Sequence, residues 1–231
     1  MSVVVTGASD GIGAACVEAF RAEGMHVVGV DVEETSAADE HHVVDLSSQL
    51  CGDEIESLMD GRVVEVLVNN AALAEYSTAL ETDAETWDRT LAVNLRAPFL
   101  VARALYRRLR EARGAVVNVS SVHALATSPG AAAYAASKGG LLALTRALAL
   151  EWAPEVRVNC VLPGAVDTAM LVDGLSRSGL TVEELGANHP LGRVGSPEEI
   201  AEAVVFLANS RFTTGAALTV DGGATARLST E

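Results

Sequence analysis

The sequence has only three cysteines and lacks a C-x-x-C pair. Cys16, Cys51 and Cys160 are odd in number and widely spaced, so we predict neither a disulfide framework nor a metal site. No apolar run approaches the ~18 residues that a membrane helix needs. The amino terminus shows no basic stretch and no cleavage site of a targeting segment. These absences favour a reduced, cytoplasmic setting without membrane contact.

Positive charge is also scarce. The chain has 16 lysines and arginines against 31 aspartates and glutamates, which gives a formal net charge of -15 at pH 7. Such a charge repels phosphate backbones and anionic lipid headgroups. We therefore expect a small-molecule substrate and no nucleic acid as partner, although an acidic balance alone indicates only a well-solvated surface.

What the sequence does have is an alternation of short apolar runs with longer helical patterns. The 231 residues are 49% hydrophobic, which is enough for one buried core, and we expect one domain over 1–231. The apolar runs lie at Val3–Thr6, Val27–Val30, His42–Val44, Val64–Val68, Ala115–Val119, Arg157–Val161 and Ala217–Val220, and the helical patterns near 11–23, 50–60, 84–111, 132–152 and 197–208. Because most runs are apolar at consecutive positions, the rhythm predicts an α/β doubly wound Rossmann fold, with a seven-stranded parallel sheet and helices on both faces.

The longest stretch of uncertain structure is 165–192, which contains several glycines. A loop of this length in a compact domain is usually a lid or a binding segment, and it can carry short helices. We expect this segment to cover the substrate.

The segment Thr6–Gly13, TGASDGIG, follows the first predicted strand and opens a helix. Gly7 can make the tight exit from the strand, Gly11 lets the backbone approach a pyrophosphate, and Gly13 lets the helix pack closely on the sheet. The amides at the helix start then face the phosphates. A flexible turn is the alternative, but a strand before it and a helix after it favour dinucleotide binding.

Asp31 ends the second predicted strand, 18 residues after Gly13. At about 20 residues beyond the glycines, an acid accepts hydrogen bonds from the adenosine ribose and repels a ribose phosphate. Asp10 adds negative charge, and no arginine follows Asp31 directly. We therefore predict NAD instead of NADP, the alternative being that Asp31 is an ordinary acid at a strand end.

Further short motifs follow along the chain in this order: Asp45-Leu46, NNAA at 69–72, Asn94 in VNL, NVSS at 118–121, YAASK at 134–138, PGAV at 163–166 with Thr168, and VDGG at 220–223. Together with TGASDGIG they make the chain resemble the short-chain dehydrogenase/reductase family from Thr6 to Gly223. The resemblance implies hydride transfer between NAD and a secondary alcohol or ketone. It also implies cofactor contacts from Gly7, Ser9, Asp10, Gly11, Ile12, Gly13, Asp31, Asp45, Leu46, Asn69, Ala71, Tyr134, Lys138, Val166 and Thr168.

The spacing of Tyr134 and Lys138 also singles them out as a pair, since positions four apart share one helix face. A tyrosine can exchange a proton at neutral pH only if nearby positive charge stabilises its phenolate, and Lys138 supplies such a charge. Ser121 lies just beyond the end of the strand at 115–119, where ligands gather in open α/β sheets. By resemblance, Ser121 and not Ser120 is the catalytic serine, and Lys138 also holds the nicotinamide ribose.

Asn94 lies four residues before Pro98, which has no N–H to donate to the Asn94 carbonyl. The resemblance implies that Asn94 holds a water that links Lys138 to solvent, so Pro98 would leave the needed acceptor open. A simple kink in the helix is the alternative.

Two features depart from the family pattern. Ala72 stands where the family usually has glycine, and the connection Val32–His41 is short and acidic, with room for little or no helix. Leucines in the expected cover point to a small or medium apolar substrate: Leu171, Leu175, Leu180 and Leu185, with Leu73 and His123 beside them. The alternatives are lid packing for the leucines and a structural role for His123.

Two other functions stay open. Five arginines near the end of the helix at 84–111, at positions 103, 107, 108, 110 and 113, could dock an acidic carrier of a ketoacyl substrate, or they could complement the helix dipole. Asp31 argues against a ketoacyl carrier-protein reductase, because such family members generally use NADPH. A noncatalytic dinucleotide-binding sensor is the other alternative. By resemblance we also expect a homotetramer.

Overall fold

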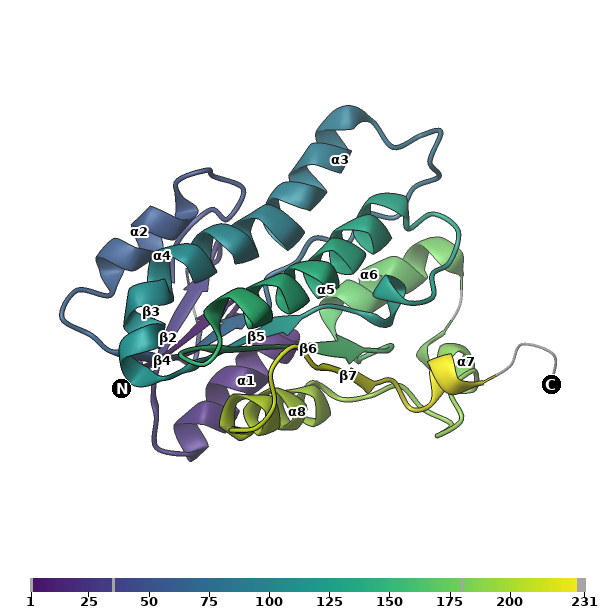
Figure 1. Ribbon diagram of the computed structural model, residues 1–231. Helices are drawn as coiled ribbons and strands as arrows, with labels where there is room; N and C mark the ends of the chain where they lie inside the picture. Colours follow the sequence, from purple (N-terminus) through teal and green to yellow (C-terminus); the bar gives the residue numbers. More distant parts are fainter. Residues whose placement is uncertain (1, 35, 180, 228–231) are drawn as a thin grey trace.

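The computed structural model describes residues 2–34, 36–179 and 181–227 of the chain (Figure 1). Seven strands form one sheet in the order β3-β2-β1-β4-β5-β6-β7, and every neighbouring pair is parallel. The strands are β1 (Ser2–Thr6), β2 (His26–Asp31), β3 (Glu40–Val43), β4 (Val64–Asn69), β5 (Ala115–Val119), β6 (Arg157–Pro163) and β7 (Ala217–Val220). The order reverses between β1 and β4, so the predicted doubly wound Rossmann fold with seven parallel strands is confirmed.

Helices cover both faces of this sheet, as predicted (Figure 1). Helices α1 (Gly11–Ala22) and α8 (Pro197–Asn209) lie on one face. The other face is covered by α2 (Cys51–Leu58), α4 (Ala97–Ala112) and α5 (Ala132–Trp152). Across the part of the chain that the structure describes, no helix is both long and apolar enough to span a membrane.

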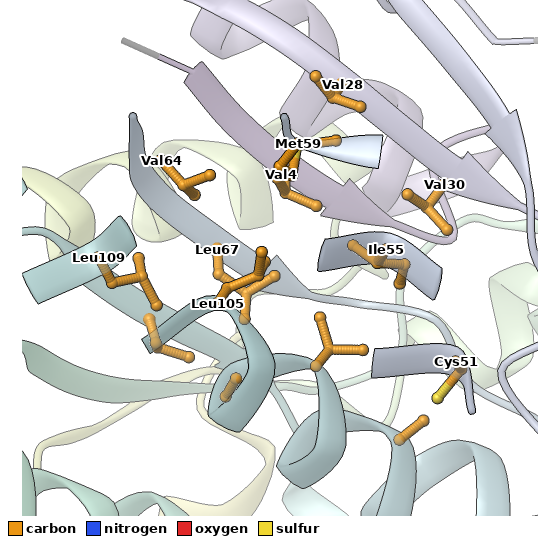
Figure 2. Close-up of a cluster of buried hydrophobic side chains, with 14 of the residues drawn as sticks. Val4, Val28, Val30, Cys51, Ile55, Met59, Val64, Leu67, Leu105 and Leu109 are labelled. Carbon is orange, nitrogen blue, oxygen red and sulfur yellow. The ribbon is translucent and has the colours of Figure 1, made fainter. Parts of the chain in front are cut away.

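Alternate residues of β1 explain how one strand serves both layers. Val3 and Val5 are buried against α1 and α8, whereas Val4 belongs to the opposite cluster. In that cluster Leu67 of β4 meets Leu105 of α4, as Figure 2 shows. Burial on both faces accounts for the uninterrupted valines of the sequence, because each side chain of the strand enters a core.

The predicted helix at 84–111 is divided into three parts. It begins as α3 (Ala84–Leu91), continues as a π-helical segment (Ala92–Arg96), and resumes as α4. The N–H of Ala97 donates to the carbonyl of Ala92, five residues back. Pro98 follows at once and cannot donate a backbone hydrogen bond. Single π turns of this kind occur within α-helices and frequently lie at functional sites.

The segment 165–192 carries two short helices, α6 (Ala169–Ser178) and α7 (Val182–Gly186). Leu180, one of the leucines expected to cover the substrate, lies outside the described residues. The short connection between β2 and β3 contains no helix in its described part. Here Ser36 and Ala38 pack on Gly29 of β2, in the space that a Cβ atom on this glycine would need.

Candidate active site

A cavity of about 900 Å³ opens at the carboxyl ends of the strands. Its wall includes residues that directly follow β1, β2, β4, β5 and β6, and residues of α6. In an open parallel sheet this edge, beside the point where the strand order reverses, is where ligands bind. The volume lies near the upper end of the range for small-molecule and cofactor sites.

The turn between β1 and α1 forms one end of the cavity. Gly7 and Gly11 have positive φ angles of 66° and 52°, a conformation that favours glycine. A Cβ atom on Gly7 would lie 2.8 Å from the Cα of Ala71, and one on Gly13 would collide with the carbonyl oxygen of Gly7. Gly7 and Gly13 thus have the turn and packing roles that the sequence predicts for them, whereas the approach of a pyrophosphate to Gly11 stays a prediction.

This turn also contains an unsatisfied polar atom. The hydroxyl oxygen of Ser9 is buried and has no hydrogen-bond partner among the described residues. Ser9 itself does not line the cavity, but Gly7 and Gly11 do, at the start of α1, where backbone amides can face an anionic ligand such as a pyrophosphate. The glycine turn at the cavity edge therefore fits a dinucleotide.

Asp31 lies at the end of β2 and lines the cavity. One of its carboxylate oxygens accepts a 3.0 Å hydrogen bond from the N–H of Ser9, and the other accepts a 2.7 Å bond from the N–H of Val32. The carboxylate therefore connects the glycine turn to the end of the second strand. It also places negative charge beside the turn.

Tyr134 and Lys138 come together on one face of α5, next to the end of β5. Tyr134 is 8% exposed and Lys138 is 2% exposed. The Lys138 ammonium lies 5.6 Å from the centre of the Tyr134 ring and donates a 2.9 Å hydrogen bond to the carbonyl of Val119. The Ser120 hydroxyl donates to the carbonyl of Lys138 at 2.8 Å. Val119, the last residue of β5, and Ser120, which follows it, therefore both hold this lysine.

Burial shifts the acidity of both groups. It raises the pKa of Tyr134 well above its ordinary value, an effect that the neighbouring phenol of Tyr76 strengthens and a hydrogen bond with Ser121 opposes. It lowers the pKa of Lys138 to about 8. The site brings Ser121, Tyr134 and Lys138 to one cavity wall, which is the convergence that the sequence predicts.

Asn94 is completely buried in the π-helical segment and does not line the cavity. Its side-chain oxygen accepts a 2.7 Å bond from the N–H of Leu73, and its amide donates to the carbonyl of Leu73 and to the hydroxyl of Ser137. The Ser137 hydroxyl in turn donates to the carbonyl of Tyr134. The side chain thus joins the segment after β4 to the helix that carries Tyr134. The predicted water on the Asn94 carbonyl stays a prediction.

The structure sorts the predicted cofactor residues into two groups. The residues that line the cavity are Gly7, Asp10, Gly11, Ile12, Asp31, Asp45, Leu46, Ala71, Tyr134, Lys138, Val166 and Thr168. Ser9, Gly13 and Asn69 do not line it. Asn69 is buried and donates to the side chain of Asn118 in the neighbouring strand, so its side chain joins two strands.

Asn70 and Tyr76 are among the lining residues that the sequence analysis does not single out. Asn70, and not Asn69, lines the cavity, and its amide donates to the carbonyls of Thr6 and Gly7. Tyr76 lies with its ring centre 6.1 Å from that of Tyr134. The motif NNAA contains Asn70 but does not say which asparagine faces the ligand, and no motif contains Tyr76.

Comparison with known proteins agrees with this geometry. The profile of a family described as enoyl-(acyl carrier protein) reductase matches residues 7–225. An uncharacterized short-chain type dehydrogenase/reductase of Sinorhizobium fredii is 40% identical over 96% of this chain, which spans 43% of that relative. The 2-(S)-hydroxypropyl-CoM dehydrogenase 3 of Xanthobacter autotrophicus is 36% identical, with 97% of this chain and 96% of the relative covered.

Solved structures are similar along the whole chain. The aldohexose dehydrogenase of Thermoplasma acidophilum has a TM-score of 0.93 and 33% identity, with 100% of this chain and 96% of that chain covered. A 4-hydroxyisoleucine dehydrogenase complexed with NADH has a TM-score of 0.89 and 30% identity, covering 98% and 99%. A protein described as a putative NAD(P)-dependent gluconate 5-dehydrogenase of Beutenbergia cavernae, with bound NADP, has a TM-score of 0.91 and 33% identity, covering 98% and 97%. Similar chains therefore bind either form of the nicotinamide dinucleotide.

Proposed function

The chain belongs to the short-chain dehydrogenase/reductase family of oxidoreductases, and from that premise we propose that it transfers hydride between NAD and a secondary alcohol or ketone. One observation carries the proposal. Ser121, Tyr134 and Lys138 line the same cavity as the glycine turn of a dinucleotide site, so a proton-transfer group lies where a nicotinamide nucleotide would react.

Each of the three side chains has its own task. In the oxidative direction Tyr134 takes the hydroxyl proton of the alcohol, and in the reductive direction it returns that proton to the carbonyl oxygen. A bound nicotinamide would accept or supply the hydride. Lys138 favours the phenolate of Tyr134 through its positive charge. The Ser121 hydroxyl donates a hydrogen bond to the substrate oxygen, where charge develops during the reaction.

NAD is the form of the cofactor that we propose. The Asp31 carboxylate lines the cavity and accepts bonds from three backbone N–H groups, those of Ser9, Val32 and Glu33, which hold the carboxylate beside the turn. This charge would repel the phosphate of NADP and would accept hydrogen bonds from the ribose of NAD. Asp10, also in the lining, adds repulsion of the same sign.

A kinetic comparison tests the activity. We expect the purified protein to form NADH from NAD and at least one member of a panel of secondary alcohols, measured by absorbance of the reduced cofactor. Tyr134→Phe should lose about 10²–10⁴-fold in kcat while NADH fluorescence reports unchanged binding. A wild-type protein that binds NADH but oxidises no alcohol and reduces no ketone would favour a sensor. A Tyr134→Phe variant as active as the wild type would refute the mechanism.

A ketoacyl carrier-protein reductase is the second candidate, because the matching family profile is described as enoyl-(acyl carrier protein) reductase, a name that includes a carrier-bound substrate. Two of the arginines expected to dock the carrier already have partners within the chain, which argues against this candidate. Arg108 donates to the Glu56 carboxylate and to the carbonyl of Arg62, and Arg103 lies 5.4 Å above the Phe99 ring. A clear preference for NADPH with a carrier-bound ketoacyl substrate would select this candidate.

We also propose a homotetramer in the cytoplasm, by resemblance to the family. Phe99 on α4, Leu150 on α5 and Phe206 on α8 leave apolar side chains exposed in the single chain, and contact with further copies would cover them. Sedimentation at micromolar concentration tests the assembly, and a monomer would contradict it.

A further inference from the structure

The wall of the cavity around Tyr134 is aromatic. The ring centres of Tyr76 and His123 lie 6.1 and 5.5 Å from that of Tyr134, and 6.4 Å from each other. All three residues line the cavity. At these separations the three rings form one cluster beside the reacting hydroxyl.

Leucines of the cover form the other part of this wall. Leu171 and Leu175 of α6 and Leu185 of α7 line the same cavity. Gly174 lies over the ring of Tyr76, where a Cβ atom would be 3.6 Å from the ring edge, so the helix approaches this ring closely. A substrate beside Tyr134 thus meets flat rings and branched aliphatic side chains.

Charged side chains are few in the described cavity lining and, apart from Lys138, belong to other segments than this wall. Among the lining side chains that the structure describes, the charged residues are Asp10, Asp31, Asp45, Arg89 and Lys138. Asp10 precedes α1, Asp31 ends β2 and Asp45 follows β3. Hydrogen bonds from Ser47, together with the charge of Arg89, lower the pKa of the Asp45 carboxyl. Lys138 is held by Val119 behind Tyr134. Among the described lining residues, no lysine or arginine belongs to α6, to α7 or to the segment that carries Tyr76.

His123 adds a neutral polar group to this wall. Burial lowers the pKa of this imidazole, which favours its neutral form. Its Nδ1 atom is paired with the hydroxyl of Thr127 at 2.9 Å, which leaves Nε2 as the ring nitrogen for a substrate. Its backbone N–H donates to the Ser121 hydroxyl, so the position of the ring is tied to the catalytic serine.

We propose that the substrate is an uncharged secondary alcohol, or the matching ketone, whose larger substituent is an apolar ring packed between Tyr76, His123 and the leucines of α6 and α7. The inference rests on the proposed function and deepens it. In the oxidation the alcohol carbon loses hydride to NAD and the hydroxyl loses its proton to Tyr134, so that the ketone, NADH and one proton are formed. An anion placed in this wall would lose its hydration without gaining a cationic partner from the described lining of α6, α7 or the Tyr76 segment.

Two matched pairs of substrates test the proposal. Methyl 3-hydroxybutanoate and 3-hydroxybutanoate share the reacting carbon and differ in charge, whereas 1-phenylethanol and 2-butanol differ in the ring. We expect kcat/KM to be higher for the ester than for the acid, and for the phenyl compound than for butanol, each by at least about tenfold. An acid as good as its ester, or a ring without advantage, would overturn the proposal.

Variants of the wall provide the matched controls. Tyr76→Ala should remove most of the advantage of 1-phenylethanol over 2-butanol, whereas Tyr76→Phe should keep it, because the ring remains. Leu175→Arg should raise kcat/KM for the acid relative to the ester by about tenfold or more, since it adds the missing cation. Thermal unfolding of each variant shows whether it is folded. If Tyr76→Ala is unfolded, the substrate pairs and Leu175→Arg still decide the question.

The result also separates this inference from the proposed function. If no alcohol in the panel yields NADH although NADH binds, the proposed oxidoreductase activity fails. If NADH forms but 3-hydroxybutanoate reacts as fast as its methyl ester, the activity stands and only the uncharged, ring-bearing substrate is refuted.

Discussion

The ammonium of Lys138 lies 5.6 Å from the centre of the Tyr134 ring, and both side chains are almost completely buried. Burial disfavours the charged form of each group: it raises the pKa of Tyr134 and lowers that of Lys138 to about 8. The proposed reaction nevertheless needs an ammonium next to a phenolate. The site therefore trades stability of the folded chain for chemical function.

The first prediction is that Lys138→Met stabilises the protein near neutral pH while abolishing activity. Between the folded pKa of about 8 and the ordinary 10.5, the unfolded chain binds more protons at this lysine than the folded chain does. The stability of the wild type therefore rises with pH across this window. At pH 7 the methionine avoids the whole cost of burying the charge, and Tm should rise by about 2–4 °C for each kcal/mol regained.

Thermal scans at pH 7 and pH 9.5 check this expectation. The Tm difference between Lys138→Met and the wild type should shrink at the higher pH. An exposed Arg113→Met substitution, which removes a cation from the end of α4, serves as a control whose effect should not change over this window. A difference for Lys138→Met that is equal at both pH values would contradict the account.

The sheet and the glycine turn could be predicted from sequence because they depend on local rules. Val3, Val4 and Val5 are consecutive apolar residues. Only a strand that is covered on both faces can bury all three side chains. Gly7 and Gly13 follow this strand at positions where a Cβ atom would meet backbone. Local sequence and tertiary environment agree there, so a pattern of residue types is sufficient.

The substrate side of the site depends on long-range contacts that no local pattern records. Tyr76 follows β4, whereas its neighbours Tyr134 and Gly174 belong to α5 and α6. The sequence predicts an ordinary helix around Asn94 where the structure has a π-helical segment, because helical periodicity does not distinguish one extra residue in a turn. Here only the assembled fold brings the residues together.

The second prediction concerns the cysteines. Cys16, Cys51 and Cys160 are free and fully buried, and burial raises the pKa of the first to about 12 and of the last to about 11. Because the thiolate is the reactive form, N-ethylmaleimide at pH 7.5 should leave the native protein unmodified and label all three thiols after denaturation, as read by mass. Rapid labelling of the native chain would contradict the burial.

The third prediction assigns Asn94 a positioning role through its side chain. Asn94→Ala leaves three polar groups of Leu73 and Ser137 without their partner, and each unsatisfied buried group costs about 1–3 kcal/mol. The Tm should fall by several degrees, and kcat should fall because the bond chain to Tyr134 is broken. Ser137→Ala, which removes one link of this chain, should lower Tm less. Equal Tm values for Asn94→Ala and the wild type would refute the role.

The last prediction separates the charge of Asp31 from its hydrogen bonds. Asp31→Asn keeps the shape and one acceptor oxygen, so it retains part of the link to the N–H groups of Ser9 and Val32, but it removes the charge that repels a ribose phosphate. The ratio of kcat/KM for NAD over NADP should fall by about tenfold or more, which is about 1.4 kcal/mol of discrimination. Asp31→Ser shortens the side chain as well, so it should show the same loss of preference with a larger fall in Tm. Cofactor preference depends here on the charge of residue 31, whereas the Tm depends on its hydrogen bonds. Thermal scans measured beside the kinetics therefore separate the two effects. Equal use of both cofactors by the wild type would remove Asp31 as the discriminating residue, whereas an unchanged ratio in Asp31→Asn would assign the preference to shape or hydrogen bonding instead of charge.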